Sequence, residues 1–254
     1  IQHQFFGFDN SVSNYYSSTD TEPKPIFIVG CPRSGSTLLI QIMIANYITA
    51  YITNLMAATP CHMLKWSQLS KKLALDTIRE SYYGYIPGFF SPNECGAIFN
   101  YWFDEYSTNK RKNVYATILA LEKIFEGPFI GKNLQNSLRI ENILKIFPNA
   151  HFLWITRDPI YTCQSIYNAR IALGIDNTRH WWSIKPVGYE KFIGLPLTEQ
   201  ISWQVSTIIK SIKYYKSIKP LSFTEISYEK MIYDVHYTKS ILDKCGLVQK
   251  NSKF

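Results

Sequence analysis

Short apolar segments alternate along the chain with segments whose apolar residues recur at helical spacing. Ile26 to Val29 and His151 to Thr156 have the pattern of strands buried on both faces, and Phe129 to Asn133 resembles a third, shorter strand. Between the last two, Ser137 to Phe147 reads as an amphipathic helix that Pro148 ends. This alternation predicts an α/β fold, a three-layer sandwich around a mostly parallel sheet.

The middle of the chain has a different pattern. A second strand is expected within Ala50 to Met56, and helices are expected over Leu64 to Tyr83 and Val114 to Phe125. Ser91-Pro-Asn-Glu94 has the form of a capping box that would start a helix running to about Tyr106.

These elements suggest how the domain is organised. We interpret residues 25–254 as one domain, with residues 60–127 as a helical insertion that forms the substrate pocket and lid. Residues 1–24, rich in aromatic and then in small polar residues, are expected to form a tail or a strap across the surface.

Composition narrows the class of ligand and the compartment. The 254 residues carry a formal net charge of +8, which suits an anionic ligand. Neither an arginine-rich run nor a nucleic-acid motif is present, so no nucleic-acid partner is expected. Five cysteines without metal-ligand spacing favour a reducing, cytoplasmic location over a disulfide framework. No signal peptide is expected, and the uncharged residues 34–59 are interrupted by polar side chains, which argues against a membrane span.

A candidate anion site follows the first strand. Gly30 and Gly35 break the apolar run, and Ser34, Ser36 and Thr37 can cap a helix that begins there. A strand that leads through a tight turn into a helix N-terminus presents backbone N–H groups to an anion. The spacing is close to that of a Walker A loop, but Ser36 stands where the lysine should be, and the cation is Arg33.

A second candidate anion site follows the strand that ends at Thr156. Arg157 leaves the carboxyl end of this strand, where open α/β sheets bind ligands. Ser165 follows eight residues later, about two turns along the next helix. The guanidinium group of Arg157 suits a phosphate, although a salt bridge to a neighbouring carboxylate is the alternative.

Together these motifs resemble those of sulfotransferases that use 3′-phosphoadenosine 5′-phosphosulfate (PAPS), in particular the branch with a Pro-Arg-Ser-Gly-(Ser/Thr)-Thr loop. The resemblance implies the P-loop-like sulfotransferase fold. It also implies transfer of a sulfuryl group to a hydroxyl or amine of a small-molecule acceptor, as in natural-product tailoring, and release of adenosine 3′,5′-bisphosphate. It implies that the reacting 5′ end of the donor is held by the turn residues Arg33, Ser34, Gly35, Ser36 and Thr37, and that Arg33 faces this end. It also implies that Arg157 and Ser165 hold the 3′-phosphate. It further implies that Lys132 reaches the bridging oxygen or the acceptor, that Tyr228 belongs to the donor site, and that no metal is required.

The general base is not evident from the sequence. Positions where the resembling enzymes carry a histidine or a glutamate hold Leu134, Asn136 and Asn54 here. Candidates for proton transfer or acceptor binding are instead His62, Glu94 and His180, and the aromatic residues of the insertions, including Trp102 and Trp181, suggest a ring-bearing acceptor.

Two other functions remain open at this stage. A small-molecule P-loop kinase would share the turn, although the Walker lysine and an acidic strand end are missing. A non-catalytic nucleotide-binding module would need no base. Neither the oligomeric state nor the identity of the acceptor is encoded in a motif.

Overall fold

A parallel four-stranded sheet forms the centre of the molecule, in the order β2-β1-β3-β4. The computed structural model describes residues 9, 12, 22–73, 80–104, 108–175 and 178–250. The strands are β1 (Ile26–Gly30), β2 (Ile130–Lys132), β3 (His151–Thr156) and β4 (Phe223–Ser227). β1 is buried along its whole length, and it pairs in parallel with β2 on one side and β3 on the other.

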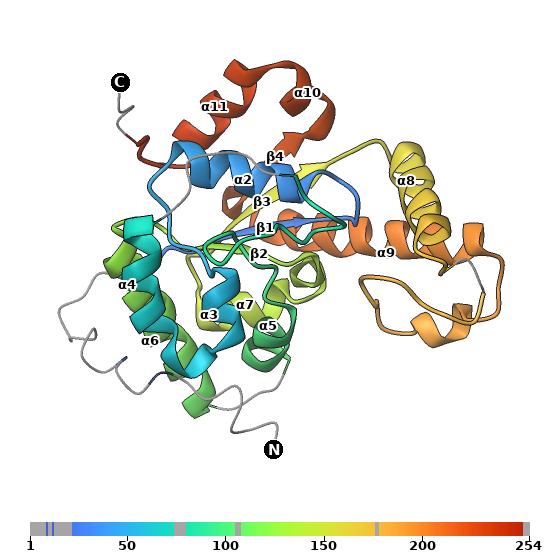
Figure 1. The fold of residues 1–254 in the computed structure, drawn as a ribbon. Helices are drawn as coiled ribbons and strands as arrows, with labels where there is room; N and C mark the ends of the chain where they lie inside the picture. Colours follow the sequence, from blue (N-terminus) through green and yellow to red (C-terminus); the bar gives the residue numbers. More distant parts are fainter. Residues whose placement is uncertain are drawn as a thin grey trace.

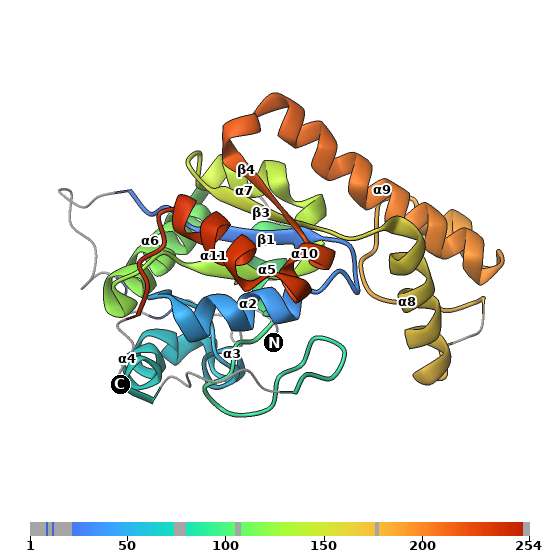
Figure 2. The same cartoon turned by 90° about the horizontal axis from the view of Figure 1, so that it is seen from above.

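Helices cover both faces of this sheet. Figure 2 shows α2 (Ser36–Asn46) on one side and α7 (Ile140–Ile146) and α9 (Leu197–Ile218) on the other. Near β4 lie α10 (Tyr228–Tyr233) and α11 (Val235–Lys244). This three-layer α/β arrangement confirms the fold class that the alternating pattern predicts.

The chain between α2 and β2 is mainly helical. It contains α3 (Asn54–Ala58), α4 (Met63–Leu73), α5 (Gly96–Phe103) and α6 (Thr108–Phe125). On the other side of the molecule, α8 (Pro159–Ala172) and the first half of α9 project from the body (Figure 1). Short 3₁₀ helices complete the chain at Pro60–His62, Leu134–Leu138, Tyr189–Phe192 and Pro220–Ser222.

Three expectations about the elements were wrong. The second strand is reduced to isolated bridges, because Ala50 meets Phe129 and Thr53 meets Pro92 before the chain turns into α3. The helix expected over Ser137 to Phe147 is divided, since the 3₁₀ helix before α7 ends only at Leu138.

The third wrong expectation is the capping box at Ser91. The hydroxyl of Ser91 donates to the carbonyl of Pro87, and the helix begins five residues later, at Gly96. Glu94 is therefore not a capping residue, and its side chain is available for another contact.

The helix expected to begin at Leu64 is described as α4, to Leu73, and residues 74–79 lie outside the described residues. Most of the expected tail over residues 1–24 also lies outside them. Of the part that is described, the Asp9 carboxylate accepts a hydrogen bond from the Leu64 backbone N–H at 3.0 Å, and Val12 is buried.

Candidate active site

A cleft of about 680 Å³ opens at the carboxyl ends of the strands, where parallel sheets bind ligands. Six separate parts of the chain form its walls. They are Pro32, Arg33 and Gly35 to Leu38 from the turn after β1; Ser81, Tyr83, Gly84, Glu94, Asn100 and Asp104 from the insertion; Lys132 to Gln135 and Arg139 at the end of β2 and after it; Arg157 after β3; Trp182 to Lys185 before α9; and Tyr228 after β4.

The turn after β1 is shaped to expose a helix N-terminus. The N-cap of α2 is Gly35, which has a φ of 93° and no capping side chain, so the first N–H groups of α2 keep the anion-binding potential of an uncapped helix. The expected capping by the hydroxyl residues is therefore wrong. A Cβ at Gly35 would lie 2.3 Å from the Tyr228 ring, which leaves room only for glycine. Behind the turn, the Ser137 hydroxyl accepts from the Gly30 N–H at 2.9 Å and donates to the Gly30 carbonyl at 3.0 Å.

A buried lysine joins this turn to the insertion. Lys132 ends β2 and is 3% exposed. Its Nζ donates to Thr37 Oγ1 at 3.0 Å and forms an ion pair with the carboxylate of Glu94. Burial lowers the pKa of Lys132, and the neighbouring Glu94 carboxylate opposes that shift. The Glu94 side chain is 41% exposed, so the carboxylate remains accessible in the cleft.

The position of Glu94 is fixed on two further sides. Its backbone carbonyl accepts from Asn133 Nδ2 at 3.0 Å. Gly84 lies against its carboxylate so closely that a Cβ there would be 2.3 Å from Oε1. The turn containing Gly84 is closed by reciprocal backbone hydrogen bonds between Tyr82 and Tyr85.

The second predicted anion site adjoins the first. Arg157 donates through Nη1 to the Arg33 carbonyl at 2.7 Å, and its guanidinium group lies 4.6 Å from the centre of the Tyr228 ring. Ser165 is not among the residues that line the cleft, but its hydroxyl accepts from Arg33 Nε at 3.3 Å. The structure thus brings Arg33, Arg157, Ser165 and Tyr228 together.

One detail differs from the expected geometry. Arg33 was expected to face the reacting end of the donor, whereas its guanidinium group reaches towards Ser165 and lies 5.4 Å from the centre of the Tyr83 ring. The cation beside the hydroxyl of the turn is Lys132. Arg33 occupies a left-handed backbone conformation, with φ at 65°.

Four other candidates do not line the cleft. His62 lies exposed in the 3₁₀ helix before α4. Trp102 is buried against Phe99 in the core. His180 is exposed and Trp181 half-buried, and the Trp181 indole donates to the Ile184 carbonyl. Of the named candidates for proton transfer, only Glu94 lines the cleft.

Sequence reasoning missed the far wall of the cleft. There Arg139 donates from Nε and Nη2 to both carboxylate oxygens of Asp104, at 2.5 and 2.8 Å, and from Nη2 to Asn100 Oδ1. Gln135 Oε1 accepts the backbone N–H of Lys185 at 3.2 Å. No sequence motif links residues 35 or more positions apart, so these contacts could be found only in three dimensions.

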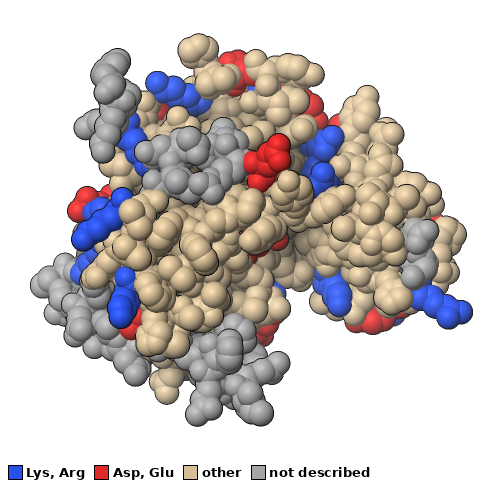
Figure 3. Space-filling view, in the orientation of Figure 1, with Lys and Arg blue, Asp and Glu red and all other residues tan. Residues whose placement is uncertain are grey.

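Three general properties limit what the site can be. Over the described ranges, no group of three or more His, Cys, Asp or Glu side chains is placed to hold a metal ion. None of the helices in those ranges is both long and apolar enough to cross a membrane. Lys and Arg residues are scattered over the face shown in Figure 3 and do not form a continuous basic patch there.

Comparisons with known proteins indicate the family and the fold of the chain. The family described as "Sulfotransferase family" matches residues 25–250. Sulfotransferase STF9 from Mycobacterium avium is similar in structure, with a TM-score of 0.60 and 17% identity over 92% of this chain and 65% of that chain. Sulfotransferase STF1 from Mycobacterium tuberculosis has a TM-score of 0.57 and 14% identity, over 91% of this chain and 69% of that chain.

A sulfotransferase from Alicyclobacillus acidocaldarius has a TM-score of 0.50 and 13% identity, over 92% of this chain and 87% of that chain. At such identities the likeness concerns the fold alone. The chain spans just under two thirds of the STF9 chain. Among curated proteins, none is similar enough in sequence to match.

Proposed function

The chain belongs to the sulfotransferase family, and from this premise we propose that it transfers a sulfuryl group from PAPS to a hydroxyl or amine of a small-molecule acceptor. In this reaction the acceptor oxygen or nitrogen forms a bond to sulfur, and the bond from sulfur to the bridging oxygen breaks. The electron pair leaves with adenosine 3′,5′-bisphosphate, and the acceptor gives up a proton.

One observation carries the proposal: the two candidate anion sites are joined. Arg157 donates to the Arg33 carbonyl, and Arg33 donates to Ser165. A ligand held at both sites needs one anionic group over the N-terminus of α2 and another near Arg157 and Ser165. The two phosphates of PAPS meet this requirement, and the guanidinium fork of Arg157 suits the dianionic 3′-phosphate.

Lys132 and Glu94 have the chemistry that the transfer step needs. Lys132 is buried between Thr37 and Glu94, where a cation stabilises charge that develops on the leaving phosphate. Glu94 comes from the opposite wall with an accessible carboxylate, so it can accept the proton of an acceptor that approaches beside Lys132. We therefore assign the role of base to Glu94. His62 stays an untested candidate that does not line the cleft.

Calorimetric titration tests the donor site. We expect adenosine 3′,5′-bisphosphate to bind without metal and at least about tenfold more tightly than AMP, since one charge-assisted contact is worth about that factor. Arg157→Ala should remove most of this preference while AMP binding changes little. Arg179→Ala, an exposed arginine that does not line the cleft, serves as the control and should retain the preference.

The same titration contains the opposing result. Tighter binding of ATP with magnesium than of the bisphosphate would favour the kinase alternative and contradict the proposal. Equal losses for AMP and the bisphosphate in Arg157→Ala would contradict the assignment of Arg157 to the 3′-phosphate.

A further inference from the structure

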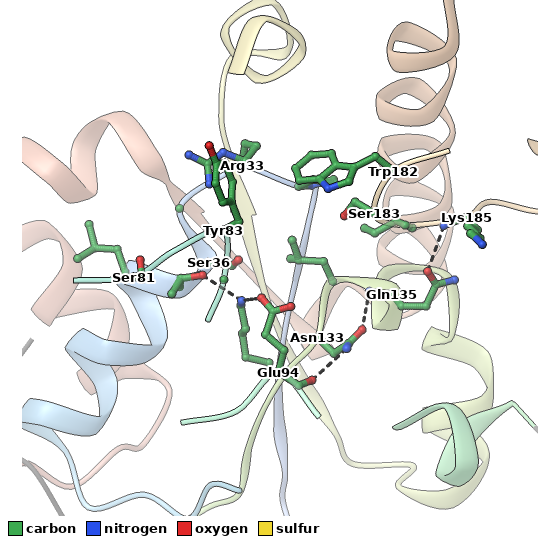
Figure 4. Close-up of a pocket in the computed structure, with 18 of the residues that line it drawn as sticks. Arg33, Ser36, Ser81, Tyr83, Glu94, Asn133, Gln135, Trp182, Ser183 and Lys185 are labelled. Carbon is green, nitrogen blue, oxygen red and sulfur yellow. Dashed lines mark hydrogen bonds and ion pairs between the residues drawn. The ribbon is translucent and has the colours of Figure 1, made fainter. Parts of the chain in front are cut away.

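The cleft continues beyond Lys132 into a region that the transfer step does not use. Its walls there are Asn100, Asp104, Gln135, Arg139, Trp182 and Lys185. Figure 4 shows Ser183, Lys185 and Gln135 on the same side of the cleft, with Trp182 between them and Arg33.

The order of the strands separates this region from the donor site. Tyr228 and Arg157 follow β4 and β3, the turn follows β1, and Lys132 ends β2, which is the edge strand. A donor held by the turn, Arg157 and Tyr228 lies over β1, β3 and β4. The region past β2, next to α5, is therefore left for the acceptor.

The most distinctive feature of this region is the ion pair between Asp104 and Arg139. The Arg139 side chain is only 6% exposed, whereas that of Asp104 is 47% exposed. A buried guanidinium group thus holds a carboxylate that lines the cleft and remains partly exposed. Glu94 and Lys132 repeat this arrangement, with 41% and 3% exposure.

This wall has a definite hydrogen-bonding character. Each ion pair is neutral as a whole, but its accessible atoms are carboxylate oxygens, which only accept hydrogen bonds. Arg139 also has a buried nitrogen, Nη1, without a partner among the described residues. Of the aromatic residues in the insertions, which suggest a ring-bearing acceptor, Tyr83 and Trp182 line the cleft whereas Trp102 and Trp181 do not.

From these contacts we infer that Asp104 and Arg139, together with Trp182, bind the acceptor, and that the acceptor is a hydroxyl-rich ring compound of the sugar or cyclitol class. This inference rests on the proposed function. Neighbouring hydroxyls would donate to Asp104, and the indole of Trp182 offers a flat apolar surface for the ring. A simple phenol would leave Asp104 without a donor.

Ligand binding and turnover can both be measured. Saturation-transfer NMR on the protein saturated with adenosine 3′,5′-bisphosphate would compare methyl glucoside, methyl galactoside and myo-inositol with 4-nitrophenol and 2-naphthol. The same compounds would be offered with ³⁵S-labelled PAPS. We expect signals and sulfation from members of the hydroxyl-rich set and not from the phenols.

Variants then locate the acceptor site. Asp104→Asn should raise the acceptor KM at least about tenfold, the loss expected for a hydrogen bond to a charged group, with the affinity for the bisphosphate within about twofold of wild type. Trp182→Ala should do the same, and it carries the test if Asp104→Asn fails to fold because Arg139 is left unpaired.

Two variants serve as controls. Glu225→Gln breaks an ion pair with Lys216 whose carboxylate is similarly exposed, at 45%, and Phe89→Ala removes an exposed aromatic of the insertion. Neither residue lines the cleft, so the acceptor KM should not change.

Two results would overturn the inference while the proposed function stands: sulfation of the phenols in preference to the hydroxyl-rich set, or an acceptor KM unchanged in both Asp104→Asn and Trp182→Ala. If the wild-type protein does not bind the bisphosphate, the proposed function fails, and the inference fails with it.

Discussion

At the scale of single residues, Lys132 is the side chain on which the proposed chemistry depends most. An isolated lysine is rarely almost fully buried, and Lys132 is stabilised there by the Thr37 hydroxyl and the Glu94 carboxylate. The position in the turn where a Walker A loop has its lysine is Ser36 here. Lys132, from the neighbouring strand β2, lies beside the turn instead. Arg33, the cation within the turn, is directed towards Ser165 instead.

Glu94→Gln tests the proton acceptor at this scale. The amide keeps the size of the side chain but cannot accept a proton, so we expect kcat to fall by about a hundredfold or more. The affinity for the bisphosphate should remain within a few fold, as calorimetry would show.

Glu80→Gln is the matched control, because Glu80 is an exposed carboxylate in the same insertion and does not line the cleft. Its kcat should equal that of the wild type. A Glu94→Gln enzyme with near-normal kcat would show that the base lies elsewhere.

At the scale of elements, the turn after β1 and the start of α10 form one unit. Tyr228 packs against Gly35 and also stacks on Arg157, while Glu229 accepts the Asp158 backbone N–H at 2.9 Å. The first two residues of α10 therefore contact both candidate anion sites. A change in the turn that displaces Tyr228 should therefore also alter the contact between Tyr228 and Arg157.

Gly35→Ala tests this coupling, and Gly194→Ala provides a matched control. Both glycines have a φ of 93°, but nothing lies within 4 Å of a Cβ at Gly194, whereas the Tyr228 ring blocks one at Gly35. Each substitution should lower the free energy of unfolding by about 1 kcal/mol for the left-handed backbone.

Only Gly35→Ala should also weaken binding of the bisphosphate, by about tenfold or more, because it displaces Tyr228. Chemical denaturation and calorimetry measure the two effects separately. Equal binding by the two variants would contradict the coupling.

The elements predicted best from the sequence were strands whose residues are nearly all buried. β1 and β3 were predicted closely because strands buried on both faces are apolar throughout. The 50–56 segment is apolar as well, but it forms bridges because α3 begins at Asn54, where the Thr53 hydroxyl caps the helix. Glu94 resembled a capping residue because local spacing cannot reveal that Lys132, 38 positions away, is its partner.

At the scale of the whole molecule, the two ends of the sheet have different roles. The cleft lies at the carboxyl ends of the strands, whereas Glu122 of α6 lies at their amino ends. There its carboxylate accepts the backbone N–H groups of Phe129, at 2.9 Å, and Lys24, at 3.3 Å. Burial raises the pKa of Glu122 from 4.5 to about 7, against the opposing effect of these two N–H groups.

This raised pKa predicts how stability depends on pH. Between about pH 4.5 and pH 7 the unfolded chain loses the Glu122 proton and the folded chain keeps it, so the free energy of unfolding should fall as the pH rises. Glu122→Gln should remove this contribution. Its melting temperature should therefore decline less than that of the wild type over this range, by a few degrees, since about 1 kcal/mol corresponds to roughly 2–4 °C in a domain of this size.

Glu141→Gln is the control for this pH dependence. A hydrogen bond and ion pair with Lys145 lower the pKa of the exposed Glu141 carboxyl, so it titrates below the range in question. The Glu141→Gln protein should follow the wild-type pH dependence. If Glu122→Gln follows it too, the buried carboxyl does not control stability in this range.

The strand order β2-β1-β3-β4 has a consequence for how this protein could diversify. The half of the cleft that we propose for the donor is formed by the segments directly after β1, β3 and β4, whereas the opposite half comes mainly from residues 81–104 and from the segment after β2. On the proposed assignment, substitutions within residues 80–104 other than Glu94 would alter which acceptor is bound and would leave the donor site unchanged.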